Sequence, residues 1–372
     1  MHFKPELMVF GNLALDIKNS ALIPVPGGCA FNSAVTAASL GTPTLLTGPL
    51  GNDSGALVFH RAISELNESM AGSDDDFTSE TIRLSDEVSP DSATGLVIYP
   101  GPELQANNHR PQSFPNANSH YEGLNLISAI HCSPSISALL ASGTQYTPLM
   151  RTSLPEILKT ARSKSIVTIL APGRIFPGTG PALAEAIMEC DLLILNREEW
   201  AVLVTQCPDI ELKMEAQGAD LIVTMDSSGG QFRFHGQRTP VTPCSGTWKA
   251  PSLCAIAEPG GESAAFADSI GAGDSIGAGN SIGAGDSLAG AFAGALANAL
   301  NHTLTGTPKG TLKTTQLDID ELLSIAIAAS FITCGVSGVA RGAGFRARCT
   351  DLAIRIREDQ ILSMDIFSAQ PE

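Results

Sequence analysis

A glycine-rich segment, Asn280-Ser-Ile-Gly-Ala-Gly-Asp286, runs without a break into Ser287-Leu-Ala-Gly-Ala-Phe-Ala-Gly-Ala-Leu-Ala-Asn-Ala-Leu300, which is rich in alanine and leucine. The second part predicts a helix. The small residues before it leave backbone N–H groups free at the helix N-terminus, where an anion can approach closely. A carboxylate at Asp286 is poorly placed for anion binding alone, but it suits a general base that takes a hydroxyl proton beside a phosphate site. The alternative is an aspartate that caps an ordinary helix.

The glycine-rich unit is copied three times in succession. From Asp268 the sequence reads Asp-Ser-Ile-Gly-Ala-Gly twice and then Asn-Ser-Ile-Gly-Ala-Gly, before Asp286. A period of six residues cannot build a solenoid, which needs repeats of about 20 residues or more. If the helix followed the first copy, four glycines would fall in its first turns, and each costs roughly 1 kcal/mol relative to alanine. We therefore expect the third copy to carry the active aspartate, and residues 268–279 to be an inserted loop or an artefact of the gene model.

Short apolar segments alternate with helix-like segments along most of the chain, and no linker divides it. This alternation predicts an α/β fold in one domain over residues 1–372, with helices on both faces of a mainly parallel sheet. The segment 100–120 has no periodicity and predicts a long loop, and the polar segment 69–79 predicts a solvated loop. Strands are expected at 7–15, 44–47, 94–99, 126–131, 165–170, 191–195 and 221–225, and helices at 30–40, 56–66, 154–162 and 181–189.

The composition excludes several classes of protein. Of the 372 residues, 43% are apolar and 16% are charged, which is enough apolar sequence for a sizeable core. Lys and Arg number 22 and Asp and Glu 38, so the formal net charge is −16, and unspecific nucleic-acid binding is not expected. The eight cysteines are scattered and form no CxxC pair, which favours reduced thiols over a zinc site or a disulfide framework. P-loop and GxGxxG motifs are absent from the sequence.

Two stretches bear on location. The N-terminal sequence has no basic region followed by a long apolar run, so no secretory signal is expected. The segment 322–340 has the length of a membrane span, but Ser324, Ser330 and Thr333 interrupt it, and a buried core helix is the expected structure. These features predict a cytoplasmic protein with no membrane partner.

A second glycine motif lies near the N-terminus. Gly27-Gly-Cys-Ala-Phe-Asn32 opens the helix expected at 30–40, and Gly41 and Gly51 follow at turn positions. With residues 280–286 about 250 residues further on, this arrangement resembles the two signatures of the ribokinase-like (PfkB) carbohydrate kinase family. Asn196-Arg-Glu-Glu199 is similar to that family's Asn-x-x-Glu element, residues 221–230 to its nucleotide loop, and residues 92–98 to a strand of its lid.

The resemblance implies a three-layer, ribokinase-like sandwich and an ATP-dependent kinase that phosphorylates a hydroxymethyl group of a small sugar or related polyol. It implies that Asp286 is the general base, that Glu199 orders Mg²⁺ near the ATP phosphates, and that other residues surround them. These are Gly283, Ala284 and Gly285 in an anion hole, Asp16, Gly28 and Asn32 at the substrate, and Asn196, Thr224 and Gly229 at the nucleotide. Plainer alternatives are a strand-end turn residue for Asp16, a solvated helix face for Glu198 and Glu199, and an ordinary strand residue for Thr224.

The chain departs from the family pattern in two further places. Only about ten residues separate Asp16 from Gly27, so the β lid, expected at about 17–26 and 89–113, is short. A short lid would weaken a homodimer formed through it. Asp226 stands in the nucleotide loop where the family usually has glycine. Two alternatives therefore stay open: a nucleoside kinase of the same fold, or a degenerate member that binds a metabolite without turnover.

Overall fold

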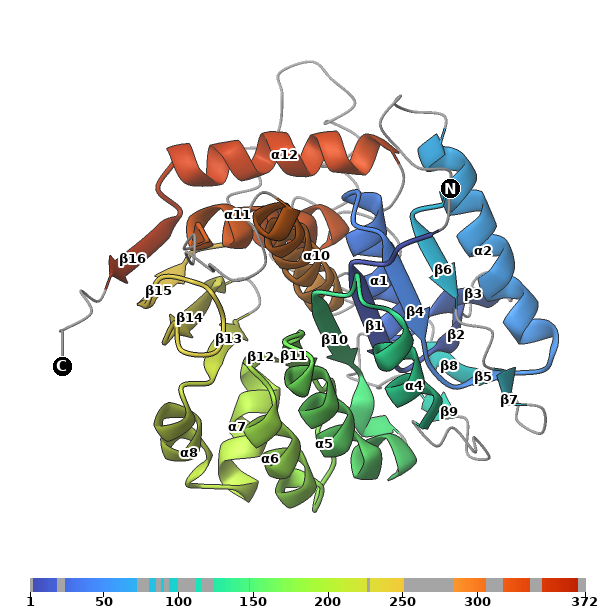
Figure 1. Cartoon of the computed structure of the whole chain (residues 1–372), viewed down its shortest axis with the longest axis horizontal. Coiled ribbons are helices and arrows are strands. Elements are labelled where there is room, and N and C mark those ends of the chain that lie inside the picture. Colours follow the sequence, from blue (N-terminus) through green and yellow to red (C-terminus); the bar gives the residue numbers. More distant parts are fainter. Residues whose placement is uncertain are drawn as a thin grey trace.

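A ten-stranded sheet runs through the protein in the order β16-β15-β14-β13-β12-β11-β10-β1-β4-β6 (Figure 1). The structure, a computed structural model, describes residues 3–18, 24–71, 80–84, 88–89, 94–99, 112–114, 124–146, 148–225, 228–250, 284–305, 317–334 and 343–366. The strands from β13 to β6 are parallel, and β14, β15 and β16 extend one edge in antiparallel pairs. The bounds are β1 (Leu7–Gly11), β4 (Thr44–Thr47), β6 (Ile82–Leu84), β10 (Ala138–Ser142), β11 (Val167–Ala171), β12 (Leu192–Asn196), β13 (Asp220–Thr224), β14 (Gly230–Phe234), β15 (Cys244–Trp248) and β16 (Leu362–Ile366).

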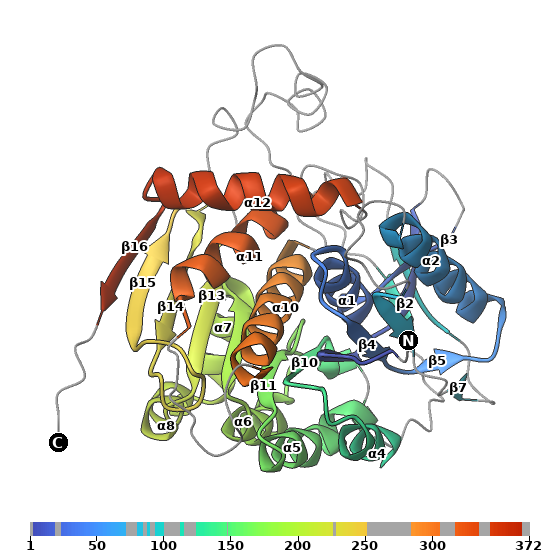
Figure 2. The ribbon, with the colours of Figure 1, turned by 45° about the horizontal axis from the view of Figure 1, so that its top comes forward.

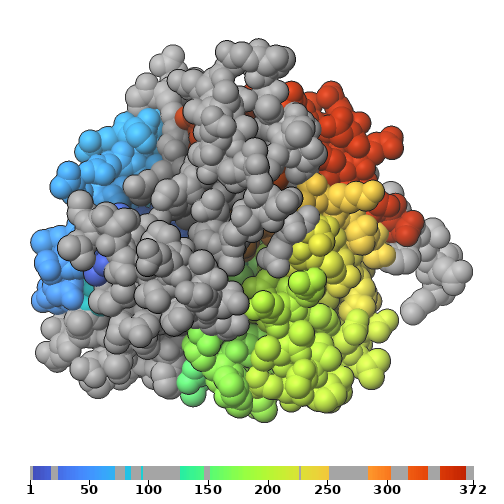
Figure 3. All heavy atoms as spheres, turned by 180° about the vertical axis from the view of Figure 1, so that it is seen from behind, coloured from blue at the N-terminus to red at the C-terminus, as the bar shows by residue number. Residues whose placement is uncertain are grey.

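Helices cover both faces of this sheet, as Figures 1 and 2 show. Successive side chains of β1 point to opposite faces, so Leu7 and Val9 join one buried core and Met8 and Phe10 the other. One layer holds α1 (Cys29–Ser39), α2 (Ser54–Ala71), α10 (Ala284–Thr305), α11 (Ile319–Cys334) and α12 (Ala343–Glu358); the other holds α4 (Leu124–Cys132), α5 (Pro148–Ser163), α6 (Gly180–Glu189), α7 (Arg197–Gln206) and α8 (Ile210–Gln217). In the reverse view, α2 in blue and α12 in red lie at opposite margins (Figure 3). The predicted three-layer α/β sandwich is confirmed.

A second sheet of four strands has the order β3-β2-β8-β9. Its strands are β2 (Ala14–Lys18), β3 (Pro24–Gly27), β8 (Gly95–Tyr99) and β9 (Gln112–Phe114), and β3 contacts both α1 and α2. These strands overlap the two segments expected to form the lid. The segment 100–120 was expected to be a loop throughout, but β9 lies within it, and the rest of that segment is outside the described residues. A separate parallel pair joins β5 (Leu50–Gly51) to β7 (Val88–Ser89).

Small residues let α10 lie directly against α1. A Cβ added at Gly290 would stand 2.2 Å from the carbonyl oxygen of Ser33, so only glycine permits this approach. Buried hydroxyls cross the same contact: Thr36 Oγ1 donates to Ser287 Oγ over 3.2 Å, and Thr333 Oγ1 of α11 donates to it over 3.0 Å. The alanine- and glycine-rich composition of α10 therefore serves close packing, which brings the N-terminal glycine motif to the start of this helix.

The structure corrects two of the predicted strands. Residues 126–131 lie in helix α4, where Leu126 and Ile130, four residues apart, are both buried in one core. The strand of this region is β10, which the sequence analysis missed. Residues 7–15 form two strands and not one, because the chain leaves the main sheet at Gly11, whose φ of 150° and close approach to Ser142 exclude a side chain.

The other predicted strands and helices are present, with α2 and α5 longer than expected. Helix α2 ends at Ala71, inside the segment 69–79 that was expected to be a loop. The core helix expected at 322–340 corresponds to α11 as far as Cys334, and Leu323 and Ala326 within it are buried. Residues 335–340 lie outside the described residues. Over the described ranges, no helix combines the length and the hydropathy needed to cross a membrane.

Candidate active site

The two glycine motifs meet near the carboxyl ends of the parallel strands, the edge at which α/β sheets bind ligands. Helix α10 begins at Ala284, so the third copy of the repeat leads directly into the helix. Ala284 is buried, Gly285 is exposed, and Asp286 is half-buried in the first turn. Gly283 and the first two copies lie outside the described residues.

Helix α1 supplies two hydrogen bonds to Asp286. Asn32 Nδ2 donates to Asp286 Oδ2 over 3.0 Å. Ser33 Oγ donates to the carbonyl oxygen of Asp286, also over 3.0 Å. Burial raises the pKa of Asp286 above its ordinary value, and the hydrogen bond from Asn32 offsets only part of that rise. Asn32 therefore favours the ionised carboxylate in a site that otherwise disfavours it.

Gly28 is the N-cap residue of α1 and has a φ of 89°, which favours glycine. A Cβ added to it would stand 2.5 Å from the carbonyl oxygen of Asn12, which follows β1. The same oxygen accepts the N–H of Ala30 over 3.2 Å. Gly28 thus has a conformational reason to be glycine, and its contact with substrate stays a prediction.

Asp16 lies in the middle of β2, where it pairs with Val25 of β3. It is half-buried, and its carboxylate lies against Gly27, because a Cβ added there would stand 2.2 Å from Asp16 Oδ2. Its charge also raises the pKa of the Cys29 thiol. The expected position of Asp16 at the end of the first strand is therefore wrong, and so is the strand-end alternative. The residue belongs to the four-stranded sheet and lies against Gly27, just before α1.

Asn196 and Glu199 together cap helix α7. Asn196 Oδ1 accepts the N–H of Glu199 over 2.8 Å, and Glu199 Oε2 accepts the N–H of Asn196 over 3.0 Å, which closes a capping box. Burial raises the pKa of Glu199 to about 7; the Asn196 N–H lowers it, and the charges of Asp286 and Glu198 raise it. Glu198 is exposed and Glu199 is half-buried, so the solvated-face alternative applies to Glu198 alone.

The acidic side chains at this edge of the sheet suit a cation. Asp286 raises the pKa of Glu199 because the two carboxylates repel each other, and a nearby divalent cation would relieve that repulsion. Within the described part of the chain, no three His, Cys, Asp or Glu side chains could hold a metal by themselves. Mg²⁺ usually keeps several waters and is bound by one or two carboxylates together with substrate phosphates. The donor set therefore fits a Mg²⁺ that arrives with a nucleotide.

Thr224 and Gly229, the two residues expected along the nucleotide, lie where β13 ends and just before β14 begins. Thr224 ends β13 and is the register partner of Asn196 on β12. Gly229, just before β14, has a φ of 95°, and a Cβ added to it would stand 2.0 Å from the carbonyl oxygen of Trp248. Backbone packing alone therefore requires glycine at this position, and the contact of either residue with a nucleotide stays a prediction. Asp226 lies outside the described residues.

The sequence analysis assigned no role to Cys29 or to the loop after β10. Gly143 in this loop has a φ of 68° and packs on Cys29, since a Cβ added to it would stand 2.8 Å from Cys29 Cβ. Thr144 and Gln145 follow, both buried, and among the described residues Thr144 Oγ1 and Gln145 Oε1 have no hydrogen-bond partner. Only two weak features of the sequence pointed to these residues: a short apolar run before Ser142-Gly143, and a cysteine directly after the glycine pair.

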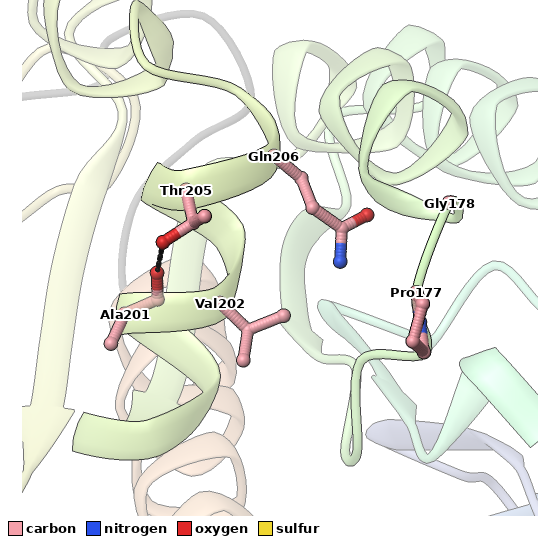
Figure 4. Close-up of a pocket in the computed structure, with 6 residues that line it drawn as sticks. All are labelled: Pro177, Gly178, Ala201, Val202, Thr205 and Gln206. Atoms are coloured by element: carbon pink, nitrogen blue, oxygen red, sulfur yellow. Dashed lines mark hydrogen bonds between the residues drawn. The ribbon is translucent and has the colours of Figure 1, made fainter.

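A separate apolar pocket lies between α7 and the loop before α6 (Figure 4). Gln206 holds that loop, because its Oε1 accepts the N–H of Gly180 over 2.8 Å and its Nε2 donates to the carbonyl oxygen of Phe176 over 3.2 Å. None of the predicted site residues lines the pocket, so we assign it no part in the reaction. Its lining residues are Pro177, Gly178, Ala201, Val202, Thr205 and Gln206.

Comparison with known proteins gives both a family and a set of similar folds. The family model described as pfkB family carbohydrate kinase matches residues 16–247. Similar structures include fructokinase with bound ATP from Xylella fastidiosa (TM-score 0.60, 15% identity, covering 95% of this chain and 99% of that chain). They also include phosphofructokinase-2 from Escherichia coli in complex with potassium (TM-score 0.61, 15% identity, 96% and 100%) and Arabidopsis thaliana ribokinase complexed with ribose and ATP (TM-score 0.56, 16% identity, 94% and 99%).

At these identities the solved structures show a common fold and no more. No curated protein matches the sequence. The family match is of a different kind, since it extends over well more than half of the chain and takes in Asp16, both residues of the glycine pair and the Asn196–Glu199 element. The chain belongs to the pfkB family of carbohydrate kinases.

Proposed function

We propose that the protein transfers the γ-phosphoryl group of ATP to a hydroxymethyl group of a small sugar or related polyol. The observation that carries this proposal is the position of Asp286 in the first turn of the 22-residue helix α10. Its carboxylate accepts a hydrogen bond from Asn32, and the N-terminus of a helix stabilises negative charge. Phosphoryl transfer to an alcohol is assisted by a group that accepts the hydroxyl proton and by groups that stabilise the charge on the transferring phosphoryl, and the start of α10 offers candidates for both.

In the proposed reaction Asp286 accepts the proton of the substrate hydroxyl while the hydroxyl oxygen forms a bond to the γ-phosphorus and the bond to the ADP oxygen breaks. The backbone N–H groups of Gly283, Ala284 and Gly285 hold the oxygens of the transferring group. When Mg²⁺ is bound near Glu199, it neutralises part of the phosphate charge. General-base assistance of this kind is worth about 10²–10⁴-fold in rate.

The remaining residues bind and orient the two substrates. Asp16, with Asn32 and the backbone of Gly28, would hold the other hydroxyls of the sugar beneath the lid sheet. Asn32 can do this while it contacts Asp286, because an amide has a second N–H and a carbonyl oxygen to offer. Thr224 and Gly229 would lie along the nucleotide beside Asn196. We also propose a cytoplasmic protein with a weakly held homodimer, which light scattering over a range of protein concentrations would test.

The test is release of ADP from ATP and Mg²⁺ in the presence of pooled sugars or pooled nucleosides. We expect turnover with at least one sugar, and Asp286→Asn should fold and bind nucleotide while losing about 10²–10⁴-fold in turnover. Turnover with nucleosides alone would identify a nucleoside kinase, and binding without turnover would identify a degenerate member. Near-full activity of Asp286→Asn together with an inactive Asp274→Asn would show that the first copy of the repeat carries the base.

A further inference from the structure

We propose that Asp53 is a positioning residue for the sugar, because its carboxylate fastens strand β8 to the start of α2 and so keeps the neighbouring Asp16 in place. This inference rests on the proposed role of Asp16 in sugar binding. Asp16 lies on β2 of the four-stranded sheet β3-β2-β8-β9, which is the lid sheet of the proposed function. Asp53 itself is none of the residues assigned to the reaction, and it stands directly before α2.

Two hydrogen bonds join Asp53 to Thr94, the residue directly before β8. The N–H of Thr94 donates to Asp53 Oδ2 over 2.8 Å, and the hydroxyl of Thr94 donates to Asp53 Oδ1 over 2.6 Å. The hydroxyl oxygen also accepts the N–H of Gly51 over 3.3 Å. Both oxygens of one carboxylate thus hold one residue that lies 41 positions further along the chain. We call this pair of bonds the Asp53–Thr94 clip.

The start of α2 gives the clip a fixed base. Asp53 Oδ1 also accepts the N–H of Ala56 in the first turn of α2 over 3.1 Å, which caps the helix. The short parallel pair of β5 and β7 brings the segment that leads to Asp53 alongside the segment that leads to Thr94. A group that is held by its own surroundings orients its partner better than a mobile group does.

The same helix start contacts the strand that carries Asp16. A Cβ added at Gly55 would stand 2.9 Å from Leu15 Cδ1 on β2 and 2.9 Å from Thr94 Cβ, so glycine permits this close approach. Strands β2 and β8 are parallel neighbours, and Asp16 is the register partner of Val97. Any shift of β8 away from α2 is therefore passed to Asp16 through the ladder of hydrogen bonds between the two strands.

The ionised form of Asp53 makes the clip. Burial raises the pKa of Asp53, but its hydrogen bonds, those from Thr94 foremost, lower that pKa below its ordinary value. The carboxylate is therefore charged at neutral pH, and hydrogen bonds to a charged acceptor are roughly twice as strong as those between neutral groups. Because Asp53 is exposed, water competes for the same carboxylate, and we expect the clip to orient the lid sheet without deciding whether the chain folds.

The experiment measures equilibrium binding of a sugar, without ATP, to Asp53→Asn, Thr94→Val and Thr94→Ser. The sugar is the member of the pool that gives the fastest release of ADP. Asparagine caps a helix about as well as aspartate, but one of its two side-chain atoms is an NH2 group, which cannot accept a bond from Thr94. Thr94→Val removes the hydroxyl and leaves the cap of α2 untouched.

We expect Asp53→Asn and Thr94→Val each to raise the Kd for the sugar about fivefold. The lid sheet would then spend less time in the position that binds, and the apparent Kd rises in proportion. Thr94→Ser, which keeps the hydroxyl, should bind within about twofold of the unmodified protein. The Kd for ATP and the melting temperature should change little in all three variants, whereas a general structural defect would change them as well.

Asp209→Asn is the matched control. Asp209 is likewise an exposed N-cap residue, but of α8 in the other helix layer, where its carboxylate pairs with Lys213 over 2.7 Å. Its replacement removes the same charge from a helix start and should leave the Kd for the sugar unchanged.

A double-mutant cycle tests whether the clip acts through Asp16. If it does, Asp53→Asn should change the remaining sugar affinity of Asp16→Asn little. An unchanged Kd for the sugar in Asp53→Asn and Thr94→Val, failure of serine to restore it, an equal rise in the Kd for ATP, or the same fivefold loss in both backgrounds would each overturn the inference. An unmodified protein that binds no sugar at all would instead overturn the proposed function, and this inference with it.

Discussion

Replacing Gly290 with alanine should strongly lower turnover, although Gly290 itself has no assigned role in the active site. Gly290 lies one turn after Asp286 on α10, against α1. The new Cβ would stand 2.2 Å from the carbonyl oxygen and 2.7 Å from the Cα of Ser33. Backbone atoms cannot rotate away as a side chain would, so the two helices must separate by about 1 Å to restore normal contact distances.

Two effects of this substitution oppose each other. Alanine is more favourable than glycine in a helix interior by roughly 0.5–1 kcal/mol. Overpacking that forces the backbone to move costs about 1–3 kcal/mol, so we expect a net loss of about 1–2 kcal/mol in the free energy of unfolding. The effect on turnover should be larger, because a shift of about 1 Å between Asp286 and its donor Asn32 can cost about 10²-fold.

The assay is ADP release together with thermal unfolding, on Gly290→Ala and on a matched control. Gly344→Ala is that control: Gly344 also lies in a helix, α12, and a Cβ added there meets no atom within 4 Å. It should keep full turnover and an equal or slightly higher melting temperature. If Gly290→Ala keeps the kcat and melting temperature of the unmodified protein, then the α1–α10 contact does not position the base and the reasoning is wrong.

Three further perturbations test the site and the fold. Glu199→Gln keeps an acceptor for the capping box but removes the charge. It should therefore raise the Mg²⁺ requirement or lower kcat, while sugar binding without ATP is unchanged. An unaltered Mg²⁺ titration would contradict this. Deleting residues 268–279 leaves one copy of the motif joined to α10 and changes the free energy of loop closure by about 1 kcal/mol or less. Melting curves and ADP release should therefore show a folded protein that is at least as heat-stable and equally active. An unfolded or inactive product would mean that the extra copies are part of the working structure. Burial raises the pKa of Asp220 to about 7, above an unfolded value of about 3.9, so its contribution to stability is present below about pH 4 and is lost as the pH rises toward 7. In Asp220→Asn the melting temperature should therefore fall less between about pH 5 and pH 7.5, and an identical fall would show that another group is responsible.

Much of the fold could be predicted because glycines and regular apolar spacing mark the ends of its elements. Helix α1, between Gly28 and Gly41, and strand β4 lie within one residue of their predicted bounds. The segment 126–131 shows the limit of this approach, because a short apolar run fits a buried strand and a buried helix equally well. Only the burial of Leu126 and Ile130 in the same core, which is a tertiary contact, decides for the helix.

The candidate site was predictable as a set of segments but not as a set of contacts. The two glycine motifs indicated that Asn32 and Asp286 belong together, although 254 positions separate them in the chain. The motifs contain no information on which donors reach the carboxylate, since that depends on how closely α1 and α10 approach. The small residues that permit the approach, such as Gly290, looked like ordinary members of an alanine-rich helix.

In the Asn196–Glu199 element, a folding role and a proposed role in the reaction involve the same side chains. Asn-x-x-Glu before an apolar run is a helix-capping pattern, and here both side chains form that cap. Because Asn196 Oδ1 is bonded to the N–H of Glu199, this oxygen is engaged in the cap and is poorly placed to bind a nucleotide as well. Its effect on the site is indirect: the cap fixes the carboxylate of Glu199, whose pKa responds to the charge of Asp286. A sequence pattern that reports only the residue types cannot distinguish the two roles, because the same side-chain geometry that satisfies the helix end also holds the Glu199 carboxylate within the electrostatic influence of Asp286.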